Sequence, residues 1–344
     1  MDLSPRGRAR RMRCHLLLGR IGLALLLLSA AAGREAGAAS RATQAPEREE
    51  YKLARRGADL VMDGDLEGAI SIAREIQRLD PQSPLGYILE ADATWWKIYY
   101  ATGNLIDPDV FDVAPSETTP YDAHLEDLVN TAISKCEEQI RAHPEVARNY
   151  LYEGLAYAVR ARFVGLRGKD LPTARAGKKM RALMLTALRL DPNLADAYSG
   201  VGIYNYFVDT LPAIVKFLKF FIALPGGNRE LGLEQLQKAG EKGELTRGES
   251  KFYLAKNYSR QNERQYSKSL EIFQAIAQEY PHNPLWPFVA GSLRCRLGQT
   301  HECDAVYRET FRKTAGEKAE VQQALHRAAQ QALQRMHPGE KFGE

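Results

Sequence analysis

From Tyr51 onward, apolar residues recur at intervals of three and four positions along the chain. In one stretch, Ile70, Ala73 and Ile76 share one face of a helix, and charged residues such as Arg74 and Arg78 occupy the other. No segment shows the sustained two-residue alternation of a half-buried strand. The pattern therefore predicts an all-α protein.

Four of the predicted helices end at a proline. The closing pairs are Asp80-Pro81, His143-Pro144, Asp191-Pro192 and Tyr280-Pro281. Proline disfavours helical geometry at the residue before it, so each pair marks a helix end followed by a sharp turn. The same closing signal, repeated along the chain, predicts a repeat protein.

Small and aromatic residues return in a common phase around these prolines. The residues in this phase are Leu53, Gly57, Leu60, Ala69 and Ile76 in the first unit, Tyr87, Ala91, Ala132 and Pro144 in the second, Tyr150, Gly154, Tyr157, Ala187 and Pro192 in the third, and Tyr198, Gly202, Gly232 and Ala239 in the fourth. Over about residues 50–315 the pattern resembles the tetratricopeptide repeat (TPR) family, whose unit is a pair of antiparallel helices of about 34 residues.

The resemblance implies an all-α, right-handed helical-hairpin solenoid of about six irregular repeats, with a C-terminal capping helix at about Glu317–Met336. The stretch from Gly200 to Glu244 is also similar to exported bacterial TPR proteins without an assigned activity. Successive closing prolines lie 63, 48 and 89 residues apart, which predicts inserts near 102–121, 160–175 and 208–228. Inserts of one class emerge on one edge of a solenoid, so we expect these three to lie together.

The first 38 residues are typical of a signal peptide. They carry a net charge of +5, and a 12-residue apolar stretch, Ile21–Ala32, precedes small residues suited to cleavage. A spanning helix needs about 20 apolar residues, so an uncleaved anchor is the weaker alternative. We expect a linker at 39–49, the solenoid at 50–336 and a polar tail at 337–344, in a chain that is exported to the periplasm or secreted.

The net charge and the absence of catalytic motifs argue against several classes of function. The chain after residue 38 has a net charge of −1, which gives no electrostatic footprint for nucleic acid. The sequence contains no P-loop, zinc-protease or nucleophile-elbow motif. His301 with Cys295 and Cys303 lacks a fourth metal ligand. We therefore expect no enzymatic activity, no cofactor and no metal.

Cys295 and Cys303 flank a predicted hairpin turn in an exported chain, so a disulfide between them is one interpretation. Two small buried residues in a tight hairpin are the alternative. Cys136 is interpreted as an unpaired core residue.

If TPR geometry holds, the concave groove is lined by Trp95, Trp96, Tyr206 and Phe207. Tyrosine and tryptophan are frequent anchors for bound partners. Aromatic residues at helical spacing also pack in cores, and this second interpretation stays open. The apolar segment 208–228, with Phe217, Phe220 and Phe221, has three interpretations: packing on neighbouring inserts, contact with a partner, or contact with a membrane surface.

The sequence thus predicts a non-catalytic, protein-binding scaffold in an extracytoplasmic compartment. Its partner, a protein or peptide, is expected in the concave groove and along the insert edge. The alternative is a peripheral, lipid-associated TPR protein that acts through 208–228. An enzyme with a novel helical site is the least favoured hypothesis, because no nucleophile is assembled with a base.

Overall fold

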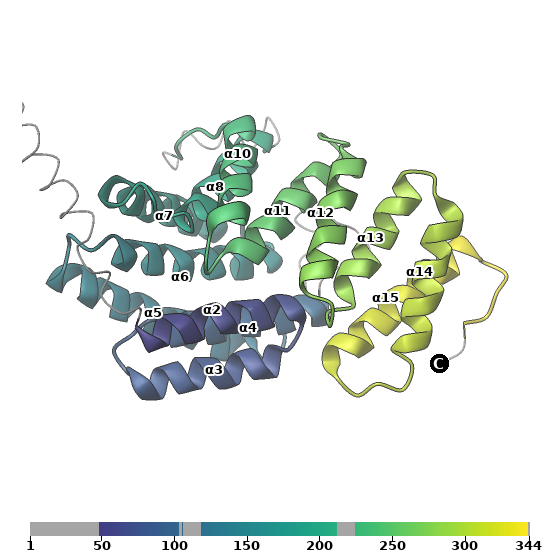
Figure 1. Cartoon of the computed structure of the whole chain (residues 1–344), viewed down its shortest axis with the longest axis horizontal. Coiled ribbons are helices and arrows are strands. Elements are labelled where there is room, and N and C mark those ends of the chain that lie inside the picture. Colours follow the sequence, from purple (N-terminus) through teal and green to yellow (C-terminus); the bar gives the residue numbers. More distant parts are fainter. Residues whose placement is uncertain (1–47, 103–104, 106–117, 212–223, 343–344) are drawn as a thin grey trace, which may run out of the picture. The chain divides into compact units, whose positions relative to one another are not determined.

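A computed structural model describes residues 48–102, 105, 118–211 and 224–342 of the chain (Figure 1). The predicted signal peptide, most of the insert near 102–121 and the centre of the segment 208–228 lie outside these residues. The described part contains thirteen α-helices, which confirms the all-α prediction. They form six consecutive hairpins and one final helix: α2 (Glu49–Asp63) with α3 (Leu66–Leu79), α4 (Leu85–Thr102) with α5 (Asp122–Ala142), α6 (Ala147–Leu166) with α7 (Asp170–Leu190), α8 (Ala197–Thr210) with α10 (Arg229–Lys242), α11 (Arg247–Ser259) with α12 (Tyr266–Glu279), α13 (Leu285–Arg296) with α14 (Thr300–Lys313), and α15 (Glu320–Met336).

The closing prolines end helices as predicted. Asp80, His143, Asp191 and Tyr280 are the C-caps of α3, α5, α7 and α12, with φ between −125° and −140°. Each precedes a proline, which excludes the helical conformation there. The six predicted helix pairs and the capping helix are therefore confirmed.

The predicted insert at 160–175 is not a loop. Its residues lengthen both helices of the third hairpin, so that α6 and α7 have 20 and 21 residues, against 15 and 14 in the first hairpin. The prediction of a separate inserted segment at this position is wrong, because the extra residues continue the helical pattern.

Small residues allow the two helices of the fourth hairpin to approach closely. A side chain built at Gly232 would come within 2.7 Å of the backbone nitrogen of Tyr206, and one at Gly202 within 2.9 Å of the carbonyl oxygen of Gly232. The two glycines therefore permit a backbone-to-backbone contact that no larger residue allows.

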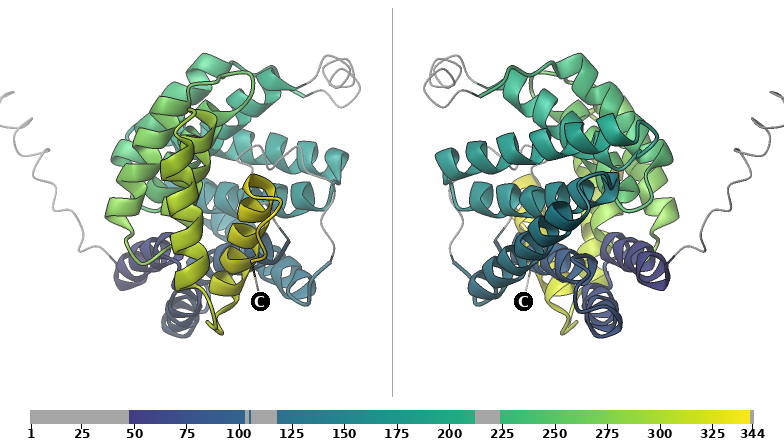
Figure 2. Two further views of the ribbon diagram at one scale, coloured as in Figure 1. Left: turned by 90° about the vertical axis from the view of Figure 1, so that its right-hand side faces the viewer. Right: turned by 90° about the vertical axis from the view of Figure 1, so that its left-hand side faces the viewer.

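The C-terminal repeats also contact the first ones. Helix α15 packs against α4, and α11 packs against α2, in addition to the contacts between successive helices. Figure 2 shows the C-terminal helices beside the N-terminal ones from two directions. Residues after α15 fold back, and the ring of Phe342 lies 6.1 Å from that of Phe311. Among the described helices, none has the length and apolar character needed to cross a membrane.

Candidate functional site

The aromatic residues predicted to line a groove lie in the core. Trp95 and Trp96 are each 2% exposed, and Tyr206 is 0% exposed. Trp96 lies edge-on to Trp286 of α13, with ring centroids 6.0 Å apart. The inner faces of distant repeats thus meet and exclude solvent. The prediction that Trp95, Trp96 and Tyr206 are open to a partner is therefore wrong.

The other predicted contact residues have different outcomes. Phe207 is half-buried, and the guanidinium of Arg260 lies 5.4 Å from the centre of its ring. Phe217, Phe220 and Phe221 lie outside the described residues, so their role stays a prediction.

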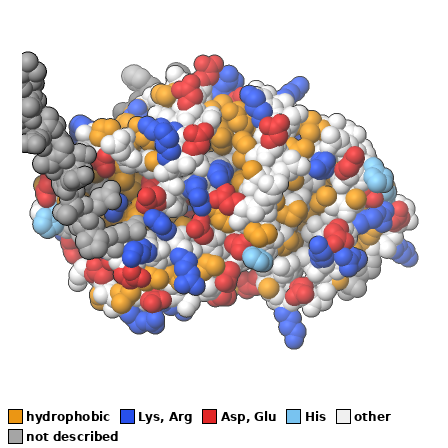
Figure 3. All heavy atoms as spheres, in the orientation of Figure 1, with side chains coloured by type: hydrophobic (Ala, Val, Ile, Leu, Met, Phe, Trp, Pro, Cys, Tyr) orange, Lys and Arg blue, Asp and Glu red, His pale blue; other side chains and the backbone are white. Residues whose placement is uncertain are grey.

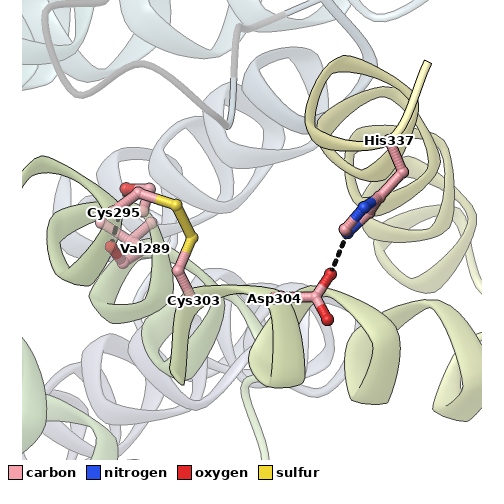
Figure 4. Close-up of a disulfide and its surroundings, with 6 residues drawn as sticks. Val289, Cys295, Cys303, Asp304 and His337 are labelled. Atoms are coloured by element: carbon pink, nitrogen blue, oxygen red, sulfur yellow. Dashed lines mark hydrogen bonds and ion pairs between the residues drawn. A yellow bond between two sulfur atoms is a disulfide. The ribbon is translucent and has the colours of Figure 1, made fainter. Parts of the chain in front are cut away.

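The sixth hairpin contains a disulfide between Cys295 of α13 and Cys303 of α14 (Figure 4). Their Cα atoms are 5.3 Å apart, and the bond joins the two helices across the turn, which is one of the two interpretations that the sequence left open. The next residue, Asp304, accepts a hydrogen bond from His337 at 2.6 Å, which ties the hairpin to the residues after α15. Cys136 is buried and free.

Hydrogen bonds join the sixth repeat to the first. The indole nitrogen of Trp286 donates to the carbonyl oxygen of Met62 at 2.8 Å, and the side-chain amide of Asn283 donates to the same oxygen at 2.9 Å. The backbone nitrogen of His282 donates to Asp63 at 3.0 Å. These bonds connect the C-terminal end of α2 to the start of α13, and so hold the inner faces of the first and sixth repeats together.

A buried ionic cluster lies where four first helices of hairpins converge. Arg162 of α6 is 8% exposed and pairs with Asp92 of α4 at 2.5 Å and with Glu249 of α11. Its guanidinium also lies 4.6 Å from the centre of the Trp95 ring. One side chain of the third repeat therefore binds carboxylates of the second and the fifth.

Burial and neighbouring charges shift the pKa values of Glu249 and Arg162. Burial raises the pKa of Glu249 to about 7, and the nearby Asp92 acts in the same direction, whereas Arg162 opposes the shift. Burial alone would lower the pKa of Arg162, but Glu249 and Asp92 outweigh it and raise that pKa. Burial also raises the pKa of Tyr253, one turn along α11. Glu249 thus holds its proton to a higher pH in the folded chain than an exposed glutamate does.

The cluster forms the floor of a cleft of about 60 Å³. Its apolar walls come from Ile88, Leu155 and Ala158, with Arg162 and Glu249 beneath them. A second hollow of about 20 Å³ adjoins it on the side of α2 and shares Ala58, Asp92, Leu245 and Glu249 with it. At roughly 10–15 Å³ per water, the larger cleft accepts a few waters or one side chain of a partner.

This arrangement is suited to binding. Its polar floor offers carboxylate oxygens to a donor, and its walls offer apolar contact. In the part of the chain that the structure describes, no three His, Cys, Asp or Glu side chains are arranged to hold a metal ion.

Asp92, Arg162 and Glu249 were not predicted as site residues, because most charged residues of a helical repeat lie on its solvated surface. A signal was present: Asp92 precedes Trp95 and Trp96 by three and four residues and therefore shares their helical face. A charged residue among aromatic residues on an inner face indicates a buried ion pair.

We compared the chain with protein families, curated proteins and solved structures. No family model and no curated protein matches the chain. A similar solved structure is TTC0263, a thermophilic TPR protein of Thermus thermophilus, with 14% identity and a TM-score of 0.41 over 71% of this chain and 98% of that one. The TPR domain of P58(IPK) is 14% identical, with a TM-score of 0.22 over 85% of this chain and 100% of that one. The chain is similar in structure to TPR proteins at low identity. Its own consecutive helix pairs have the TPR-like arrangement.

Proposed function

We propose that the chain is a non-catalytic, protein-binding scaffold that works in an extracytoplasmic compartment. The observation that carries the proposal is the cleft above Arg162, where first helices of four hairpins converge. Scaffolds built from helical repeats bind through such composite surfaces, since each repeat supplies one helix to them.

The disulfide and the predicted signal peptide support the compartment. Disulfides persist in oxidising surroundings, whereas cytosolic thiols are kept reduced. A pairing between Cys295 and Cys303 therefore suits a chain that is exported.

The partner inserts one side chain into the cleft. Its apolar part contacts Leu155 and Ala158, both of which are half-buried, and a donor group at its end reaches the carboxylates of Asp92 or Glu249. A lysine or arginine of the partner fits this floor, because two carboxylates face a single guanidinium there. In the same proposal, the insert edge supplies a second contact with the partner.

Filling the cleft tests this function. We expect Ala158→Trp to abolish co-purification of partners with the mature protein from its host, as measured by mass spectrometry. Ala142→Trp, at an exposed position of α5, is the matched control and should leave the captured set unchanged. Circular dichroism establishes that both variants fold. An unchanged set of partners with a folded Ala158→Trp variant would show that the cleft is not the binding site.

A further inference from the structure

The outer face of α7 differs from the rest of the surface. Apart from Asp170 at its start, all exposed residues of α7 are either apolar or basic. The apolar ones are Leu171, Pro172, Ala182, Leu185 and Leu190, and the basic ones are Arg175, Lys178, Lys179 and Arg189. Leu171, Leu185 and Leu190 are 42%, 38% and 42% exposed, although large apolar side chains are usually buried.

Six of these residues form one line along the helix, which we call the α7 stripe. They stand at 171, 175, 178, 182, 185 and 189, at alternating intervals of four and three. This spacing keeps side chains on a narrow seam, the geometry through which one helix packs along another. The seam reads Leu, Arg, Lys, Ala, Leu, Arg, so apolar and basic residues are mixed along about 27 Å of helix, at 1.5 Å per residue.

Two basic groups of the stripe have no acidic partner within the described chain. No carboxylate of the described residues pairs with Arg175 or Arg189, and Arg189 donates only to the hydroxyl of Thr186, at 3.1 Å. Lys179, beside the stripe, pairs with Glu153 at 3.3 Å but stays 47% exposed. The charge of Arg175 and Arg189 is therefore available to an outside ligand.

The outer helices of the neighbouring hairpins are acidic. The exposed carboxylates are Glu126, Asp127, Glu137 and Glu138 on α5, and Glu230, Glu234 and Glu241 on α10. Acidic and basic side chains are also mixed across the face seen in Figure 3. These two helices thus carry mainly acidic exposed side chains, with Arg141 and Lys242 as exposed basic ones.

We propose that the α7 stripe docks an acidic amphipathic helix of a partner protein. Leucine-type residues of that helix pack on Leu171, Ala182 and Leu185, and its Asp or Glu side chains pair with Arg175, Lys178 and Arg189. A helical ligand matches this narrow seam along its length, whereas a flat anionic membrane would contact it only along one line. The proposal extends the scaffold function proposed above and uses a different face from the cleft.

Site-specific photo-crosslinking in the host tests the proposal. A p-benzoylphenylalanine in place of Ala182, in the middle of the stripe, should capture a peptide whose Asp or Glu and apolar residues are spaced by three and four. The substitutions Arg175→Glu, Lys178→Glu and Arg189→Glu should lower the yield of this adduct at least tenfold. Arg78→Glu, Arg141→Glu and Lys242→Glu make the same charge change at exposed positions elsewhere and should leave the yield unchanged.

Other results overturn the proposal. They are the absence of an adduct, an adduct with a segment that lacks acidic residues, or equal loss in both charge variants. Flotation with phosphatidylglycerol vesicles covers the membrane alternative: flotation that the stripe variant loses, and that Phe220→Asp with Phe221→Asp keeps, would assign the stripe to lipid. Ala158→Trp separates the two proposals, because it should abolish binding in the cleft and leave the adduct at position 182 intact.

Discussion

Arg162 illustrates how one buried side chain can hold several repeats together. It is the cation between Asp92 and Glu249, whose side chains are 22% and 20% exposed. Arg162→Met removes the cation that compensates Asp92 and Glu249 in a site with little water, so we expect the free energy of unfolding to fall by about 3–5 kcal/mol. Chemical denaturation measures this loss.

Arg160→Met, two residues earlier on α6, is the matched control. Arg160 bonds to Asn130 and lies over the ring of Tyr157, both at the surface, so we expect a change of at most about 0.5–1 kcal/mol. Replacing the whole cluster by Asp92→Leu, Arg162→Met and Glu249→Leu should recover most of the loss, because no charge is then left buried. A triple variant as unstable as Arg162→Met would contradict this account.

Glu249 should give the protein a measurable pH dependence. Burial raises its pKa from an ordinary 4.5 to about 7, so the folded state holds the proton more tightly than the unfolded chain. Its contribution to stability is therefore complete below about pH 4.5 and is lost as the pH rises through 7, by at most about 1.4 kcal/mol per pH unit.

Denaturant titrations between pH 4.5 and 8 measure this slope, and Glu249→Gln should flatten it. Burial also raises the pKa of Asp196 and Glu153, which act in the same direction. The difference between wild type and Glu249→Gln isolates the group of interest. Parallel curves for the two proteins would show that Glu249 does not titrate differently on folding.

At the scale of the helices, the sequence predicted the helix ends correctly where the signal comes from neighbouring residues. The residues before Pro81, Pro144, Pro192 and Pro281 cap helices, because proline acts on its immediate neighbour. The predicted insert at 160–175 failed for a related reason: extra residues with helical periodicity lengthen a hairpin instead of leaving it, and spacing between prolines does not distinguish the two.

Close packing inside the fourth hairpin gives a second prediction at this scale. Gly232→Ala gains up to about 1 kcal/mol of helix propensity, but its new methyl group would lie 2.7 Å from the backbone nitrogen of Tyr206. We expect a net loss of about 1–2 kcal/mol in thermal or chemical unfolding. Gly177→Ala is the control: its nearest neighbour is a ring carbon of Tyr204 at 3.9 Å, so this variant should gain stability. An equal change in stability for the two variants would show that close approach of the two helix backbones does not limit position 232.

The disulfide supports the sixth hairpin. It closes a loop with a sequence separation of 8, and the entropy of such a loop corresponds to about 2–3 kcal/mol. Cys295→Ser with Cys303→Ser should lower the unfolding free energy by that amount. Reductant should affect the wild type and not the variant. A wild type that is insensitive to reductant under unfolding conditions would show that the bond is absent in solution.

At the scale of the whole described chain, the pattern of repeats predicted which helices pair but not which distant repeats meet. Periodicity gives contacts between neighbours, and small rotations per repeat decide whether an inner face stays open. The approach of repeat six covers Trp96 with the ring of Trp286, and Arg162 of repeat three covers Trp95, which is why residues suited to a partner became core. The burial of Trp96 depends on a contact between residues about 190 positions apart, that with Trp286.

The contact of repeat six with repeats one and two should make the first and last repeats unfold together. In an open solenoid each repeat is stabilised only by its neighbours, so a lesion in repeat six leaves repeat one protected. Trp286→Ala removes the ring against Trp96 and the hydrogen bond to Met62, at a cost of about 3–5 kcal/mol. We therefore expect hydrogen exchange to speed up in α2 and α4, far away in sequence, while α7 keeps its protection.

Phe288→Ala is the matched control on the same helix, since its ring packs 5.2 Å from Tyr307 within its own hairpin. That variant should loosen α13 and α14 and leave α2 unchanged. If both variants expose α2 equally, or neither does, the contact between repeats six and one does not couple them, and the chain behaves as an open array.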